Sequence, residues 1–230
     1  MQIISIDGKN INEEYGFITA SVSIQQPDVQ TKMVSIPMRD GSLDMTNAVS
    51  DAVRYKDRNI TINLFRMEAD ESKLSALASF LHGQKRQIIF EDDPGYFYYG
   101  RLSIDNVVRT KGTMKVKITA VCEPFKYDVA VSDTDWEWDV FDLENGIINE
   151  AGNIQITPGS RFTLICRRQR EFPVFIWNGP DLTLTFKGKQ YVIKEGESKL
   201  YNVFFDEGEN VLEFSGASGV LDIKYRGGSL

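Results

Sequence analysis

The chain has 230 residues and a formal net charge of -7, with 42% hydrophobic and 26% charged residues. This composition is typical of a globular protein and excludes a disordered or fibrous chain. The length predicts one or two domains, and we expect two.

The first ten residues, MQIISIDGKN, contain no basic flank that leads into an apolar run. They therefore lack the pattern of a secretory signal peptide. No apolar stretch reaches the roughly 20 residues that a membrane helix needs. We expect a protein that is made in a cytosol and has no membrane partner.

Two segments of the first half, residues 58–64 and 113–122, alternate apolar and polar residues. In the first of them, Ile60, Ile62 and Leu64 fall on one face. This period of two predicts half-buried antiparallel strands.

One short amphipathic helix is predicted between Asp70, which suits the N-cap, and Gly83, which suits the C-terminal end. The apolar residues that recur there at helical spacing are Leu74, Leu77, Ala78 and Leu81. So short a helix is marginal alone, so its apolar stripe should pack on the flanking strands.

After the helix, residues 87–90 and 98–104 resemble strands on either side of the sequence Asp-Asp-Pro-Gly at 92–95. This sequence predicts a hairpin closed by a type II turn, in which Gly95 takes a positive φ.

Four consecutive aromatic residues at 96–99 follow that turn. Neighbouring residues of a strand point to opposite faces, so one pair can fill the core while the other faces a partner. We expect Tyr96 and Tyr98 at a subunit interface. The alternative is that the chain's own loops cover the second face.

A domain boundary is predicted near residue 130, because Pro124 cannot donate to a sheet and an acidic stretch follows. The domains are then residues 1–130 and 131–230. The second contains 10 Lys+Arg and 16 Asp+Glu, a balance of -6 that argues against nucleic-acid binding. Its short alternating segments predict a β-sandwich or jelly roll: 182–186, 190–194, 211–214 and 220–225.

The sequence contains no nucleotide-binding or common hydrolase motif, and its single histidine, His82, suits the C-terminal end of the predicted helix. Carboxylates at 91–93 lie at a predicted turn, where solvation is the simpler interpretation, although a hydrolase with paired carboxylates stays an alternative. We expect no catalytic residue and no cofactor.

No metal site is expected either. The acidic series at 133–142 alternates with aromatic residues as a strand would, and it lacks the glycine and closing glutamate of a calcium-binding EF-hand loop. The two cysteines, Cys122 and Cys166, lie in separate strand-like segments and are expected to be reduced core residues.

Several segments of the first half, taken in order, resemble the N-terminal domain of the distal tail protein (Dit) family of phages and prophages with long non-contractile tails. They are Ser-Ile-Pro-Met-Arg-Asp-Gly-Ser-Leu-Asp-Met-Thr at 35–46, Tyr-Lys-Asp-Arg-Asn-Ile-Thr-Ile at 55–62, the single helix, residues 93–102, and Cys-Glu-Pro-Phe-Lys-Tyr at 122–127.

The resemblance implies a mainly β fold, with an N-terminal split-barrel domain that has one short helix and a C-terminal galectin-like β-sandwich. It also implies a hexameric ring at the virion tail tip, made in the bacterial cytoplasm, that joins the tail-tube protein to the tail-tip hub protein and to receptor-binding proteins. DNA would only pass through its channel.

The loop at 35–53 is the candidate for reaching an adjacent subunit, with Arg39, Asp40 and Leu43 as its interface residues. A plain exposed loop is the alternative. A second function stays open, that of a carbohydrate-binding β-sandwich module for host attachment. In that case the residues facing the glycan would be Trp136, Trp138 and Trp177.

Overall fold

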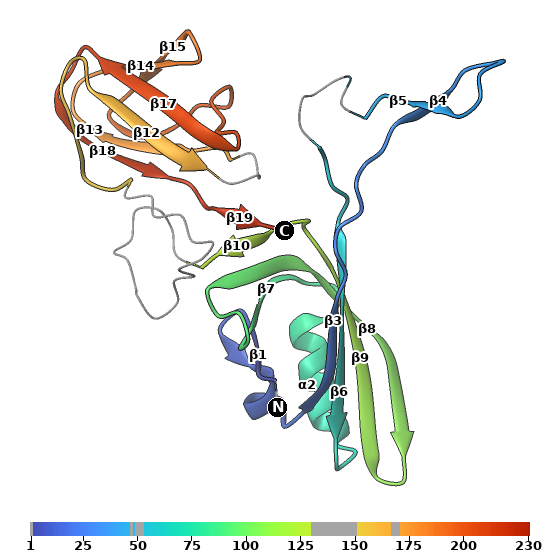
Figure 1. The fold of residues 1–230 in the computed structure, drawn as a ribbon. Coiled ribbons are helices and arrows are strands. Elements are labelled where there is room, and N and C mark those ends of the chain that lie inside the picture. The colour runs from blue at the N-terminus through green and yellow to red at the C-terminus, as the bar shows by residue number, and fades with distance from the viewer. Residues whose placement is uncertain (1, 47, 49–52, 130–150, 167–170) are drawn as a thin grey trace. The chain divides into compact units, whose positions relative to one another are not determined.

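The computed structural model describes residues 2–46, 48, 53–129, 151–166 and 171–230. The chain divides into two compact units (Figure 1). The first unit contains residues 1–93, 97–126 and 230, and the second contains residues 94–96 and 127–229. The boundary expected near residue 130 falls at the start of a segment outside the described residues.

The first unit is built on a sheet whose strands follow the order β2-β1-β7-β8-β9-β6-β3, with neighbours antiparallel. Its strands are β1 (Ile4–Ile6), β2 (Lys9–Asn10), β3 (Ile18–Ile24), β6 (Arg58–Arg66), β7 (Lys85–Phe90), β8 (Tyr96–Thr110) and β9 (Thr113–Cys122). The two strands predicted by alternation are confirmed as β6 and β9. Ile62 lies opposite Ile118, and both are buried.

Helix α2 (Glu71–Leu81) covers one face of this sheet, as its leucine stripe predicts (Figure 1). Asp70 caps it by accepting hydrogen bonds from the backbone N–H groups of Ser72 and Lys73 at 3.0 and 3.3 Å. Leu77 and Leu81 are fully buried in the core that the strands supply. The helix prediction is confirmed.

A second helix, α1 (Ile11–Tyr15), corrects the expectation of a single helix in this half. The Asn10 side chain caps it by accepting from the N–H groups of Asn12 and Glu13, and Gly16 ends it at a φ of 67°. Five residues are too few to show a helical period, so only the two caps could have indicated it.

The predicted hairpin exists, because β7 pairs antiparallel with β8. The type II turn is wrong, since Gly95 is not among the residues with positive φ. The Asp93 N–H donates to the carbonyl of Phe90 at 3.0 Å, so the chain turns before it reaches Pro94.

Arg58 is a buried cation at the start of β6, with only 2% of its surface exposed. Its Nε donates to the carbonyl of Pro124 at 2.7 Å, and its guanidinium lies 5.3 Å from the centre of the Tyr98 ring. Burial lowers the pKa of Arg58 from its ordinary value. The residue fastens the segment after β9 to β6.

The second unit contains two four-stranded antiparallel sheets, ordered β11-β18-β13-β16 and β12-β17-β14-β15. The strands of these sheets are β11 (Ile154–Ile156), β12 (Arg161–Cys166), β13 (Val174–Asn178), β14 (Leu182–Phe186), β15 (Lys189–Ile193), β16 (Gly196–Lys199), β17 (Gly208–Ser215) and β18 (Gly219–Lys224). Two further short strands, β10 (Lys126–Asp128) and β19 (Gly228–Ser229), pair with each other. Buried residues of both sheets form one core, which includes Phe175, Leu184 and Leu221. The mainly β fold is confirmed.

Both cysteines are free and buried in the cores of their units. Desolvation raises the pKa of Cys122 and of Cys166 to about 12. Both thiols are then protonated at pH 8, and the thiolate is the reactive form. We expect neither residue to react with iodoacetamide in the native protein, while both react in denaturant, as measured by mass spectrometry. Rapid native alkylation would contradict this placement.

Candidate functional site

A hairpin arm, whose described residues are 27–46, 48 and 53–57, projects from the sheet of the first unit (Figure 1). Its outer part is a separate two-stranded sheet of β4 (Met33–Ser35) and β5 (Ser42–Asp44). At the base, the Gln30 side chain donates to the carbonyl of Tyr55 at 2.7 Å and the Lys56 N–H donates to the carbonyl of Asp28 at 2.8 Å. The two chain segments of the arm are thus tied together where they leave the sheet.

The arm exposes large apolar side chains. Met33 is 59% exposed and Met38, at the tip, is fully exposed. The exposed apolar residues of the arm are Val29, Met33, Val34, Ile36, Met38 and Val53. An isolated two-stranded hairpin is at best marginally stable in water, so an arm of this kind gains stability when a partner covers it.

The loop expected at 35–53 is therefore partly a hairpin, of which β5 forms one strand. Arg39 and Asp40 lie exposed at its tip, and Leu43 lies half-buried on β5 opposite Val34. Their interface role remains a prediction. Arg39, Asp40 and Leu43 were expected from the sequence, whereas the exposed apolar residues of β4 and the tip were not.

Besides the two-residue strand β2, two longer strand edges of this sheet have no pairing strand among the described residues. β3 ends the sheet and pairs only with β6. β8 pairs with β7 over Tyr98–Arg101, and beyond that pairing the Ile104 N–H donates to Nδ1 of His82 at 3.0 Å. From Asp105 to Thr110, β8 pairs only with β9 on its other side. Free edges of this kind are ready to pair with another chain.

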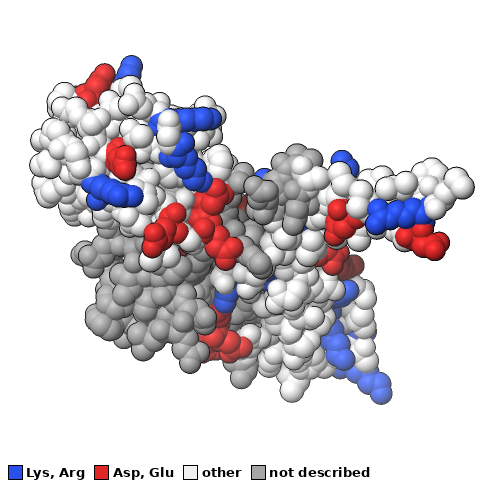
Figure 2. All heavy atoms as spheres, turned by 45° about the horizontal axis from the view of Figure 1, so that its top comes forward, with Lys and Arg blue, Asp and Glu red and all other residues white. Residues whose placement is uncertain are grey.

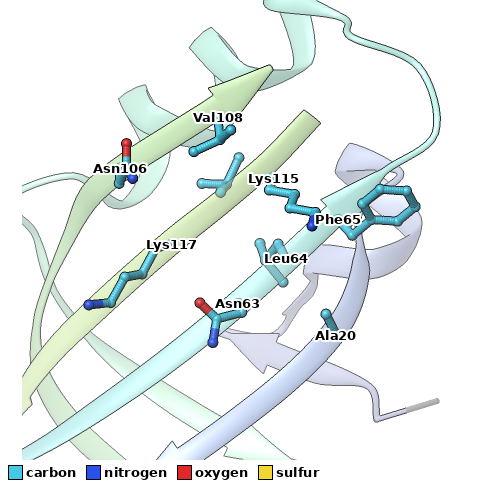
Figure 3. Close-up of a pocket in the computed structure, with 9 residues that line it drawn as sticks. Ala20, Asn63, Leu64, Phe65, Asn106, Val108, Lys115 and Lys117 are labelled. Carbon is cyan, nitrogen blue, oxygen red and sulfur yellow. The ribbon is translucent and has the colours of Figure 1, made fainter. Parts of the chain in front are cut away.

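A groove of about 550 Å³ lies across β3, β6, β9 and β8 (Figure 3). Its lining combines apolar residues with amide and ammonium groups: Ala20, Asn63, Leu64, Phe65, Asn106, Val108, Lys115, Val116 and Lys117. The Asn63 amide donates to Oγ of Ser21 at 2.9 Å, which fixes its orientation. No carboxylate lines the groove.

Tyr96 and Tyr98 do not form the outward-facing pair that we expected. Tyr96 is 8% exposed and Tyr98 is 7% exposed, and Tyr98 belongs to the core of the first unit. Phe90 packs against the Tyr98 ring, with 5.8 Å between the ring centres. Burial also raises the pKa of Tyr98. The interface role is corrected for both tyrosines, because the protomer itself covers them.

Trp177 does not face a glycan, which corrects the second expectation. It is 1% exposed on β13, and its indole N–H donates to the carbonyl of Pro180 at 2.7 Å. A Cβ added at Gly179 or Gly219 would lie within 3 Å of the ring, so the neighbouring backbone closes over it. Trp136 and Trp138 lie outside the described residues, as does the acidic series at 133–142.

The carboxylates at 91–93 make local structural contacts. Glu91 accepts from the Ile3 N–H at 3.1 Å, Asp92 accepts from the Gln2 amide at 2.7 Å, and Asp93 pairs with Lys126 at 2.6 Å. Each is thus engaged in its own contact. Within residues 2–129 and 151–230, gaps excepted, no group of metal-binding side chains comes together and no helix could span a membrane.

On the face that Figure 2 shows, Lys and Arg side chains lie among Asp and Glu side chains on both units. The end of the β8–β9 hairpin, residues 106–117, contains Arg109, Lys111, Lys115 and Lys117 and no carboxylate. The whole chain has 33 acidic and 26 basic residues, so this segment runs against the overall balance.

No family model matches the sequence, and no curated protein matches it. Among solved structures, the chain is similar to the SPP1 Dit protein, with a TM-score of 0.63 and 12% sequence identity over 100% of both chains. That protein is described as a paradigm of the hub adsorption apparatus in phages that infect Gram-positive bacteria. The likeness confirms the β-rich fold that the resemblance to distal tail proteins implies.

Proposed function

We propose that the chain is a distal tail protein, a structural subunit of a phage tail tip that acts by assembly and performs no catalysis. The observation that carries the proposal is the exposed apolar arm of the first unit. It occurs in a chain that shares its fold, over its whole length, with a phage hub protein. A protomer that exposes Met33 and Met38 on a projecting hairpin is suited to a partner that buries them.

The assembly we propose is a hexameric ring of identical copies. The arm and the free edges of β3 and β8 are different surfaces of one protomer, so each contact joins unlike patches. A contact of this heterologous kind closes into a ring when the rotation between neighbours fits. Pairing the β8 edge of one protomer with the β3 edge of the next would also remove both free edges.

The ring would join the tail-tube protein to the tail-tip hub protein and to receptor-binding proteins, and DNA would pass through its centre without being bound. The second unit would be a galectin-like sandwich on the outside of the ring. Two sheets packed around a single core support the sandwich, and the fold shared with a hub adsorption protein supports the place in the virion.

The carbohydrate-binding alternative loses one of its three tryptophans, because Trp177 is in the core. No other described residue specifically supports carbohydrate binding. A hydrolase is likewise not favoured by the carboxylates at 91–93, which make separate contacts.

Size-exclusion chromatography with light scattering tests the proposal over a range of protein concentrations. We expect a species near six times 26.1 kDa to become more abundant as the concentration rises. A mass of 26.1 kDa at every concentration, together with no binding to tail tubes, would contradict the assembly role.

A further inference from the structure

The end of the β8–β9 hairpin, residues 106–117, is bonded to the start of helix α2. Its turn contains Lys111 and Gly112, both with positive φ, and the Ala69 N–H donates to the carbonyl of Gly112 at 2.7 Å. Arg109 forms two hydrogen bonds with Glu71 in the first turn of α2, at 2.6 and 2.9 Å. These contacts hold the hairpin end against the start of the helix.

Three exposed lysines lie on this end of the hairpin. Arg109 is neutralised by Glu71, whereas Lys111, Lys115 and Lys117 are all exposed. Lys117 forms an ion pair with Asp105, at 4.0 Å. The Asp105 carboxylate also accepts hydrogen bonds from the side chains of Ser103 and Thr119, so Lys117 is one of three groups that contact it.

Apolar surface lies directly beside these lysines. Val108 is 45% exposed, and Phe65 lies in the same groove as Lys115 (Figure 3). An exposed apolar patch next to cations is suited to a partner that offers both carboxylates and apolar side chains. Such a partner is a protein surface, because the outside of a nucleic-acid duplex presents phosphates.

Nucleic acid fits this surface less well for a second reason. Affinity for duplex DNA grows with the number of phosphates that Lys and Arg neutralise. Here the surface has three exposed lysines, of which Lys117 is paired with Asp105, on a chain whose net charge is -7. A local acidic protein patch requires no such continuous track of positive charge.

We propose that the β8–β9 hairpin end, with the adjoining groove, is a docking surface for an acidic protein surface, formed by Lys111, Lys115, Lys117, Phe65 and Val108. The inference does not depend on the hexameric ring, since the surface belongs to the single protomer. It predicts that the protein bound at this end of the first unit presents an acidic surface.

The test measures binding of two fluorescent probes by anisotropy at low ionic strength, where surface charges are least screened. One probe is an acidic peptide of glutamate and leucine, and the other is a duplex DNA. The hairpin variant is K111E/K115E/K117E. The control variant, K189E/K194E/K199E, makes the same change of net charge on exposed lysines of the second unit.

We expect the wild type to bind the acidic peptide, the hairpin variant to bind it about tenfold or more weakly, and the control variant to bind it with less than about a threefold change. An equal loss in both variants would overturn the proposal, because net charge alone would then explain it. Tighter binding of duplex DNA than of peptide would make this a nucleic-acid surface, and no binding of either probe would also overturn it. Circular dichroism confirms that the variants remain folded, and light scattering reports separately whether the ring forms.

Discussion

The variant M33S/V34S/I36S/M38S should remain monomeric under conditions in which the wild type forms the ring. All four side chains are exposed in the protomer, so their loss should leave the free energy of unfolding almost unchanged. In the ring we expect a neighbour to bury them, and each apolar side chain that is fully buried contributes roughly 1.5–3 kcal/mol. Several kcal/mol lost at every contact would weaken association by at least about a hundredfold.

Light scattering after size-exclusion chromatography measures this effect directly. The matched control is I165S/F172S/V192S/Y201S, which removes four exposed apolar side chains from the second unit. The control should assemble as the wild type does. If the arm variant forms rings of unchanged stability, the arm does not join the protomers and the proposed contact is wrong.

Replacing Trp177 by alanine should destabilise the second unit by about 3–5 kcal/mol, because it leaves a large cavity in the core. The change also removes the indole donor from the carbonyl of Pro180. Domains have only about 5–15 kcal/mol of stability, so this is a large share of the total. Hydrogen exchange should become faster in β13, β14 and β18, while β6 and β9 of the first unit stay protected.

Trp177→Phe is the control, because it keeps an aromatic ring at the same position. It should cost a smaller amount, roughly 1–2 kcal/mol, from lost volume and the lost hydrogen bond. A Trp177→Ala protein that kept its full stability and instead lost binding to a glycan would show that the indole is a surface ligand-binding group.

The strongly periodic elements could be predicted from the sequence because their periodicity comes from burial. Ile60, Ile62 and Leu64 alternate with polar residues because α2 covers one face of β6 and leaves the other open. Helix α2 was equally clear, since Asp70 and its leucines combine a cap with a stripe. Strands β1 and β3 and helix α1 are short or irregular, and their places in the sheet depend on long-range pairing that no local pattern contains.

The candidate site was harder to predict for a physical reason. Neighbouring residues in 96–99 point to opposite faces of a strand, but the sequence does not show what covers each face. In the structure, the protomer itself buries both Tyr96 and Tyr98. Trp177 resembled a binding residue only because tryptophan is common in glycan sites. The arm did carry a signal, since Met33, Val34, Ile36 and Met38 are apolar residues in a segment with no helix and little core.

The proposed function depends most on a closed ring of identical subunits, which electron microscopy of the assembled protein tests most directly. Class averages of the concentrated wild type should show six equivalent subunits around a hollow centre, with one arm crossing each boundary between neighbours. Open filaments, a different rotational symmetry, or rings in which the arms point free into solvent would contradict it.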